Sequence, residues 1–311
     1  MKVLLLGGNG QLGRGFIADG GLARLGSLGV ASRDGLIDGK DGGIVADLAS
    51  PETIAAVLNS QRPDVIVNAA AYTAVDRAEQ EEALATRINA DALAVVGQWA
   101  AAHGALVVHF STDYVFDGLG HAPYGEDAAT APQGAYGRSK RAGELALAQS
   151  GAPHFTFRTA WVFSPVGQNF LRTMLRLGGE HDELRVVADQ RGTPTSTGVI
   201  VTGALAAIDR WLAADPQART AMEGTYHLTA SGDTTWHGFA EHLLRGAAER
   251  GLIPRMPRVV PITTADFPTP ARRPAYSVLD TGRFARTFGV HVPEWQAGVE
   301  QVLAALSEPT E

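Results

Sequence analysis

A short apolar run near the start of the chain ends directly in a glycine-rich turn. Residues 2–6 are predicted to form a buried strand of a parallel sheet, and Gly7, Gly10 and Gly13 follow at intervals of three. Between a strand and a helix, such a turn lets backbone N–H groups approach a pyrophosphate at the positive end of the helix. The spacing alone is weak evidence in a chain with 36 glycines, but its position after a strand favours a dinucleotide site.

Short apolar runs and helical stretches alternate along the first half of the chain. After the first strand, further strands are predicted at 27–32, 43–46, 64–68, 105–110 and 154–158. Helices are expected between them, including one that begins at Ser50 and Pro51 and a long helical run over 75–103. This alternation predicts an α/β fold, a Rossmann-like doubly wound parallel sheet, with ligands at the carboxyl ends of its strands.

The pattern becomes less regular after about residue 160. Helices are expected at 197–211, 235–250 and 293–306, and the first of these is apolar enough to return to the sheet. We therefore predict a dinucleotide-binding domain formed by residues 1–161 and about 196–222. A smaller C-terminal α/β domain, formed by about 162–195 and 223–311, is predicted to bind the substrate.

Tyr136 and Lys140 are four residues apart, so on a helix they lie on one face. A lysine ammonium beside a phenol favours the phenolate, and we expect it to lower the pKa of Tyr136 and make it a proton donor near neutral pH. Thr112, at the end of the predicted strand 105–110, is expected to hold the oxygen that receives the proton. The chain has three lysines and 23 arginines, so a lysine here indicates that a compact ammonium is required.

The end of the predicted second strand bears on cofactor choice. An acidic residue there favours NAD, whereas a nearby arginine suits the 2′-phosphate of NADP. Ser32 and Arg33 come first here and Asp34 follows, which favours NADPH, with NADH remaining possible. The alternative interpretation is a solvated loop arginine.

Composition and missing motifs exclude several classes of function. A net charge of −7 argues against a nucleic-acid partner, and the absence of cysteine excludes disulfides, thiolate metal sites and a cysteine nucleophile. The nine histidines show no metal-ligand spacing, so we expect no metal, and no Gly-x-Ser-x-Gly hydrolase elbow occurs. No apolar stretch approaches the length of a membrane span, and nothing resembles a signal peptide. A cytoplasmic location is the resulting expectation.

Several strings of sequence resemble one family. The glycine turn, Ser-Thr-Asp at 111–113 and Tyr-x-x-x-Lys at 136–140 are similar to the extended short-chain dehydrogenase/reductases. Longer strings resemble the dTDP-4-dehydrorhamnose reductases within that superfamily. They are GGNGQLG at 7–13, PDVIVNAAAYTAVD at 63–76, STDYVFDG at 111–118, RTAWVF at 158–163, DQRGTPT at 189–195 and TPARRP at 269–274.

This resemblance implies the last step of dTDP-L-rhamnose synthesis, in which a nicotinamide hydride reduces carbon 4 of dTDP-4-dehydro-L-rhamnose. It implies that Tyr136 gives the proton, that Lys140 tunes it and holds the nicotinamide ribose, and that Thr112 binds the keto oxygen. It also implies a set of binding residues. Those for the cofactor are Gly10, Gln11, Leu12, Asp47, Leu48, Ala71, Tyr72 and Thr73, and those for the sugar nucleotide are Val75, Asp113, Trp161, Asn169 and Arg273.

The sequence departs from the family at one point. Some members carry an acidic residue on the first helix that helps to bind magnesium at a dimer interface, where this chain has Arg14, Gly15 and Phe16. We therefore expect no bound magnesium and a monomer or weak homodimer. Two alternatives stay open: a related reductase that gives the carbon-4 epimer, and a non-catalytic NADP-binding regulatory subunit.

Overall fold

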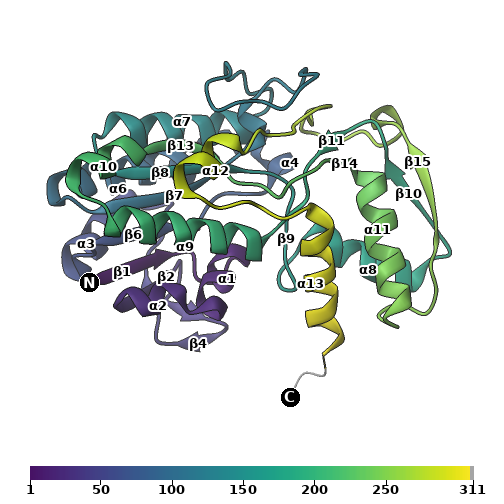
Figure 1. The fold of residues 1–311 in the computed structure, drawn as a ribbon, viewed down its shortest axis with the longest axis horizontal. Coiled ribbons are helices and arrows are strands. Elements are labelled where there is room, and N and C mark those ends of the chain that lie inside the picture. The colour runs from purple at the N-terminus through teal and green to yellow at the C-terminus, as the bar shows by residue number, and fades with distance from the viewer. Residues whose placement is uncertain (309–311) are drawn as a thin grey trace.

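A parallel sheet forms the centre of the molecule (Figure 1). The computed structural model describes residues 1–308, and within them seven strands pair in the order β13-β8-β7-β6-β1-β2-β5, every neighbouring pair parallel. This confirms the predicted Rossmann-like α/β fold. The strands are β1 (Lys2–Leu6), β2 (Ser27–Ser32), β5 (Ile44–Val45), β6 (Val65–Asn68), β7 (Leu106–Thr112), β8 (His154–Thr159) and β13 (Gly224–His227).

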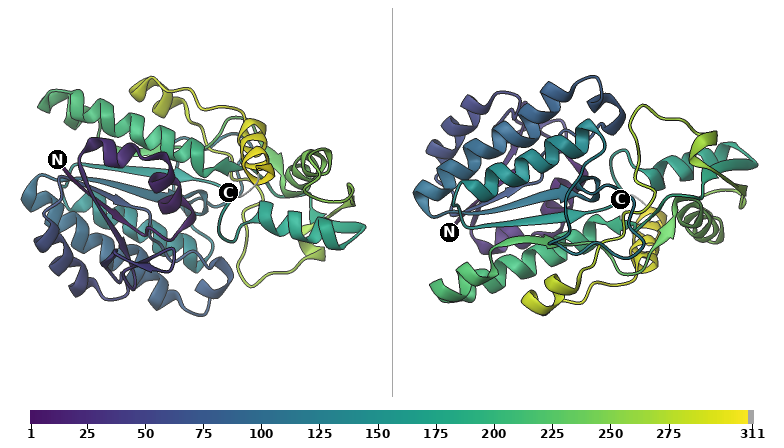
Figure 2. Two further views of the ribbon diagram at one scale, coloured as in Figure 1. Left: turned by 90° about the horizontal axis from the view of Figure 1, so that it is seen from below. Right: turned by 90° about the horizontal axis from the view of Figure 1, so that it is seen from above.

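Helices cover both faces of this sheet, which gives three layers (Figure 2). One face packs against α1 (Gln11–Asp19), α9 (Thr197–Ala213) and α12 (Gly282–Phe288). The other packs against α3 (Pro51–Gln61), α6 (Ala92–His103) and α7 (Ala135–Gln149). Because neither face meets water, the central strands are apolar almost throughout, as the sequence of β1 illustrates.

A smaller lobe lies beyond one end of the sheet, on the right in Figure 1. It contains α8 (Phe170–Glu180), β10 (Glu183–Val187), α11 (Trp236–Glu249), β15 (Arg258–Ile262) and α13 (Trp295–Ser307). Strands β10 and β15 pair in parallel, and Phe163, Phe239 and Trp295 belong to its separate core. The lobe therefore has the layered α/β character that we expected of a second domain.

The remaining elements are short. They are α2 (Gly21–Leu25), β3 (Leu36–Ile37), β4 (Lys40–Asp41), α4 (Val75–Ala78), α5 (Glu82–Thr86), a π-helix (Arg87–Asp91), β9 (Val162–Phe163), β11 (Arg191–Gly192), β12 (Thr195–Ser196), α10 (Pro216–Met222), β14 (Thr234–Thr235), and 3₁₀ turns at Asp113–Val115 and Thr264–Asp266. None of the described helices combines the length and apolar character needed to cross a bilayer.

Three local features differ from the prediction. The helical run over 75–103 is interrupted at residues 79–81, after α4, and is continuous from 82 to 103 through α5, the π-helix and α6. Ser50 precedes α3 but its side chain makes no capping hydrogen bond among the described residues. Strand β13, which we did not predict, pairs with β8 in the central sheet, so the expected boundary near residue 222 separates one strand from its own sheet.

Candidate active site

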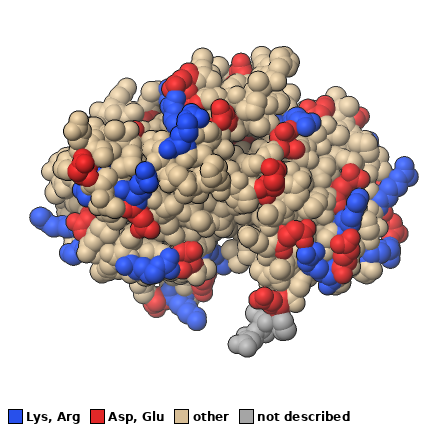
Figure 3. All heavy atoms as spheres, viewed as in Figure 1, with Lys and Arg blue, Asp and Glu red and all other residues tan. Residues whose placement is uncertain are grey.

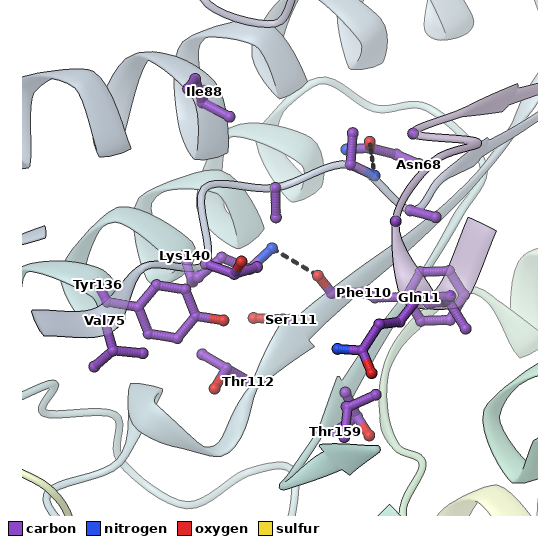
Figure 4. A pocket seen from close by; sticks show the side chains of 18 of the residues that line it. Gln11, Asn68, Val75, Ile88, Phe110, Ser111, Thr112, Tyr136, Lys140 and Thr159 are labelled. Carbon is purple, nitrogen blue, oxygen red and sulfur yellow. Dashed lines mark hydrogen bonds between the residues drawn. The ribbon is translucent and has the colours of Figure 1, made fainter. Parts of the chain in front are cut away.

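A cavity of about 720 Å³ opens at the carboxyl ends of β1, β6 and β7 (Figure 4). The turn after β1, the ends of β6 and β7 and the first turns of α7 contribute to its wall, as expected for a doubly wound sheet. Most of the predicted site residues line it. These are Gly7, Gly10, Gln11, Leu12, Ser32, Arg33, Asp47, Leu48, Ala71, Thr73, Val75, Thr112, Asp113, Tyr136, Lys140 and Trp161.

Four predicted site residues lie outside this wall. Gly13 packs α1 onto the turn, because a Cβ there would lie 2.1 Å from the Gly7 oxygen. The Tyr72 hydroxyl donates a hydrogen bond of 2.6 Å to Glu81, which raises the pKa of Tyr72. The other two, Asn169 and Arg273, contact residues next to the cavity.

Asn169 and Arg273 are those two. The Asn169 amide donates to the Gln11 side-chain oxygen at 2.8 Å, so it supports a residue of the wall. Arg273 forms an ion pair of 2.9 Å with Asp76 and lines a second cavity, of about 480 Å³. Tyr114 lines both cavities, so the two are neighbours.

The glycine turn leaves no room for side chains on its inner side. Gly7 has φ +86°, and a Cβ on it would lie 2.7 Å from the Ala70 nitrogen. Its N–H and that of Gly8 both donate to the Ala31 carbonyl at 2.9 Å, which fixes the turn against β2. Helix α1 begins directly after this turn, so its positive end faces the cavity.

Tyr136 lies in the first turn of α7, with its hydroxyl directed into the cavity toward Ser111 and Thr112 (Figure 4). Its ring meets that of Tyr114 edge to face, 5.7 Å between centroids. Burial raises the pKa of Tyr136 to about 12, although a hydrogen bond with Thr112 opposes the rise. The phenol is therefore protonated at neutral pH, as a proton donor must be.

Lys140 is one turn further along α7, and its amine points to another partner. It donates to the Phe110 carbonyl at 2.6 Å and lies 3.2 Å from Nε2 of His109. Burial lowers the pKa of Lys140 to about 8. The predicted lowering of the Tyr136 pKa by Lys140 is therefore wrong for this structure: desolvation of the phenol dominates, and Lys140 is turned toward β7.

Three polar atoms of the wall are buried without a hydrogen-bond partner among the described residues. They are Ser111 Oγ, Asp113 Oδ2 and Thr159 Oγ1. Burial raises the pKa of Asp113 to about 6, although the neighbouring Ser277 hydroxyl and a hydrogen bond of 3.0 Å from the Thr112 hydroxyl to Oδ1 oppose the rise. Buried polar atoms are rarely left unpaired, so these three are candidates to bind a ligand.

The acidic residue after β2, Asp34, lines the cavity but is already hydrogen-bonded within the protein. The Asp34 carboxylate accepts from the Leu36 N–H at 3.2 Å and from the Ser32 hydroxyl at 3.0 Å, and these bonds lower its pKa. Arg33 is exposed at the rim. A cation rather than a carboxylate is thus available to a ligand here, which suits a 2′-phosphate.

Three aromatic side chains, those of Trp161, Phe170 and Trp236, also line the cavity, and only Trp161 was predicted. The rings of Trp161 and Trp236 stack with 3.6 Å between centroids, and Phe170 lies 4.7 Å from Trp236. Trp161 holds a positive φ of 46°, a strained conformation for a bulky residue. Trp236 and Phe170 come from the smaller lobe, so no local motif marks them as site residues.

The structure shows neither a strongly charged surface on the face in Figure 3 nor a metal-binding cluster among the described residues. Acidic and basic side chains are interspersed over the face shown in Figure 3, with no broad area of one sign. Among residues 1–308, no three His, Asp or Glu side chains come together as a metal-binding group.

Comparison with known proteins gives consistent matches over the whole chain. The family model described as "RmlD substrate binding domain" matches residues 1–308. A dTDP-4-dehydrorhamnose reductase of Burkholderia thailandensis is 45% identical over 301 residues, 96% of this chain and 97% of the relative. One of Escherichia coli K12 is 41% identical over 310 residues, 100% of this chain and 99% of the relative.

Solved structures of the same kind superpose closely. The dTDP-4-dehydrorhamnose reductase of Clostridium acetobutylicum has a TM-score of 0.86 and 35% identity, covering 99% of this chain and 100% of that one. The Bacillus anthracis protein of that name, in complex with NADP, has a TM-score of 0.82 and 32% identity, covering 98% and 99%.

Proposed function

The chain belongs to the dTDP-4-dehydrorhamnose reductase family, and we propose that its cavity reduces the 4-keto group of dTDP-4-dehydro-L-rhamnose with NADPH, giving dTDP-L-rhamnose. This is the last step of dTDP-rhamnose biosynthesis. The observation that carries the proposal is that Tyr136, Lys140 and Thr112 line the same cavity as the glycine turn. A proton donor and a dinucleotide cradle are thus within reach of one reacting carbon.

The residues present fit a dinucleotide. The glycine turn excludes side chains where a pyrophosphate approaches, and α1 presents its N-terminus there. Arg33 takes the 2′-phosphate, and Lys140 holds the nicotinamide ribose. The other proposed contacts with the cofactor come from further residues that line the cavity. They are Gln11, Leu12, Asp47, Leu48, Ala71 and Thr73.

When bound, the nicotinamide supplies the hydride to carbon 4 of the sugar. As negative charge develops on the keto oxygen, the Tyr136 hydroxyl donates its proton to that oxygen, and the resulting tyrosinate is reprotonated from solvent. The Thr112 hydroxyl binds the same oxygen. Placing two hydroxyl donors where charge appears stabilises the transition state more than the ground state.

Side chains on the other part of the wall bind the sugar nucleotide. The free oxygen of Asp113 accepts from a sugar hydroxyl, and Val75 and Trp161 pack against the ring. Asn169 acts through Gln11, and Arg273 acts from the neighbouring cavity. The unpaired state of buried Asp113 Oδ2 in the described structure supports a ligand hydroxyl as its partner.

The test is NADPH oxidation by the purified protein with freshly generated dTDP-4-dehydro-L-rhamnose, with the product identified by NMR. We expect dTDP-L-rhamnose. Oxidation that yields the carbon-4 epimer would keep the mechanism and change the product. Cofactor binding without oxidation of NADPH would contradict the proposal and favour a binding subunit.

The setting of the enzyme is part of the same proposal. We propose a cytoplasmic monomer or weak homodimer without bound magnesium, which sedimentation with and without chelator tests. We propose the predicted domain division with one change. Residues 1–161 and about 196–222 bind the cofactor, and residues 224–227 are added to that domain because β13 pairs with β8 in its sheet.

A further inference from the structure

A buried group of polar side chains lies behind the active-site wall and joins two residues that line the cavity, Lys140 and Asn68. Asn68 and His109 are register partners on β6 and β7, and Nδ2 of Asn68 lies 3.2 Å from Nδ1 of His109. The other ring nitrogen of His109, Nε2, lies 3.2 Å from the Lys140 amine. All three side chains are at most 3% exposed, so they can satisfy each other only in definite protonation states.

The orientation of the Asn68 amide is fixed by the backbone. Its oxygen accepts a hydrogen bond of 3.2 Å from the Ala70 N–H. If the amide were flipped, its NH₂ group would face that N–H, donor against donor. The Asn68 NH₂ group therefore faces His109, and Nδ1 of His109 must be the acceptor.

The acceptor role of Nδ1 determines where the imidazole carries its proton. Burial lowers the pKa of His109 well below its usual value, so the ring is neutral and has one N–H. With Nδ1 accepting, that proton is on Nε2 and points at the Lys140 amine. Only an uncharged amine has a lone pair to accept it, whereas an ammonium places two donors against each other.

We propose that His109 is a positioning residue that stabilises the uncharged amine of Lys140 through its Nε2–H, so that charging of Lys140 is linked to occupation of the cofactor site. The inference rests on the proposed function only in the second clause. When a cofactor ribose offers hydroxyl oxygens to Lys140, an ammonium gains partners that the empty arrangement lacks. The amine then takes up a proton from solvent and holds the ribose as a cation.

The surrounding charges agree with this assignment. Glu144, one turn further along α7, forms ion pairs of 2.9 Å and 2.8 Å with Arg141 and Arg158. Its charge still favours the ammonium form of Lys140, but burial of the amine outweighs this effect. Within residues 1–308, no carboxylate forms an ion pair with Lys140. Burial lowers the pKa of the amine to about 8, close to the pH at which the enzyme would work.

The first test reads the His109 tautomer in the wild-type protein. Long-range ¹H–¹⁵N NMR distinguishes protonated from unprotonated ring nitrogens, and loss of one signal set in His109→Gln assigns the residue. At a pH above 9, where we expect an uncharged Lys140, the proton should be on Nε2. A proton on Nδ1 at that pH would overturn the proposal without any assumption about the reaction.

The second test uses the small number of lysines. In protein labelled at lysine, only three side chains give signals; Lys2 and Lys40 are exposed, and Lys140 is the buried one whose titration is followed. A glutamine at position 109 can turn its carbonyl toward an ammonium. The Lys140 midpoint should therefore rise by about one pH unit in His109→Gln. It should stay in place in His121→Gln, the same change at an exposed histidine.

The third measurement addresses the cofactor link. In the wild type, the Kd for NADPH should rise about tenfold per pH unit above the Lys140 midpoint, because binding must then add a proton. In His109→Gln this rise should begin at higher pH. Equal Lys140 midpoints in the wild type and His109→Gln would overturn the assignment. A Kd for NADPH that does not begin to rise with pH near the Lys140 midpoint would overturn it as well. Failure of the reductase assay alone would leave the NMR results standing.

Discussion

The Gln11 side-chain oxygen accepts a hydrogen bond of 2.8 Å from the Asn169 amide, which joins the turn after β1 to the start of α8 across 158 positions of sequence. The Ser164 hydroxyl donates to the same oxygen at 2.9 Å. The Asn169 oxygen also caps α8 by accepting from the Arg172 N–H. One asparagine thus connects the smaller lobe to the glycine turn.

We therefore expect Asn169→Ala to affect both stability and cofactor binding. Loss of the cap should lower the free energy of unfolding by about 1 kcal/mol. Loss of the contact with Gln11 should raise the KM for NADPH about three- to tenfold. Asp215→Ala removes a comparable cap, on α10 and outside both cavities, and should change stability alone. Equal KM values for the two variants would show that the contact is unimportant for the cofactor.

Tyr136→Phe tests the proton donor. We expect kcat to fall by about 10²–10⁴, the usual contribution of one acid–base group, while the Kd for NADPH stays nearly constant. Stopped-flow NADPH oxidation and fluorescence titration measure the two quantities. Tyr276→Phe, a tyrosine outside both cavities, is the control. Turnover at the wild-type rate in Tyr136→Phe would remove Tyr136 from the mechanism.

Arg33→Ala tests the preference for NADPH. Because a charge-assisted contact to the 2′-phosphate is lost, the Kd for NADPH should rise about tenfold or more, with the Kd for NADH nearly unchanged. Arg210→Ala, an exposed arginine near the end of α9, should change neither. Parallel titrations with both cofactors measure this. A similar loss for NADH would mean that Arg33 contacts something other than the 2′-phosphate.

Asp113 should make the folded protein less stable at neutral pH than it would be with an uncharged side chain. Burial raises its pKa to about 6 in the folded state. Between about pH 4 and 6 the folded state therefore binds more protons than the unfolded state, so stability falls as pH rises through that window. A pKa difference of about two units between the folded and unfolded states corresponds to a loss of at most about 3 kcal/mol in the free energy of unfolding.

The variant Asp113→Asn tests this pH dependence, because its side chain is uncharged at every pH. It should raise the free energy of unfolding at pH 7.5 and give little or no gain at pH 4, as measured by urea unfolding. It should also weaken binding of the sugar nucleotide, because the amide cannot replace both acceptor oxygens. A gain of equal size at both pH values would mean that ionisation of Asp113 is not the cause.

Much of the fold could be predicted because strands buried on both faces leave a plain signal. The runs that form β1, β6 and β7 are largely apolar, whereas β8 alternates phenylalanine with polar residues. Each of the four strands was predicted to within about two residues. Strand β13 could not be found in this way. It has the sequence GTYH, four residues with no apolar run, and only its pairing with β8 makes it a strand.

Side-chain direction limited the prediction of the site. The spacing of Tyr136 and Lys140 correctly placed both on one helix face and in one cavity, but it could not show which partner the amine would choose. That choice depends on the Phe110 carbonyl and on His109, in a neighbouring strand. The signal for His109 was present, because a histidine in the apolar run LVVHF is expected to have a buried polar partner.

The route of the chain has a consequence for how this enzyme can diversify (Figure 1). After β8 the chain enters the smaller lobe, returns as α9 and β13, leaves again for α11 and β15, and returns once more as α12 before α13. A single recombination point between two related genes therefore cannot exchange the smaller lobe intact, since any cut also separates α9, β13 or α12 from the sheet they cover or extend. New sugar specificity is more readily reached by point mutation of the cavity wall than by shuffling of gene segments.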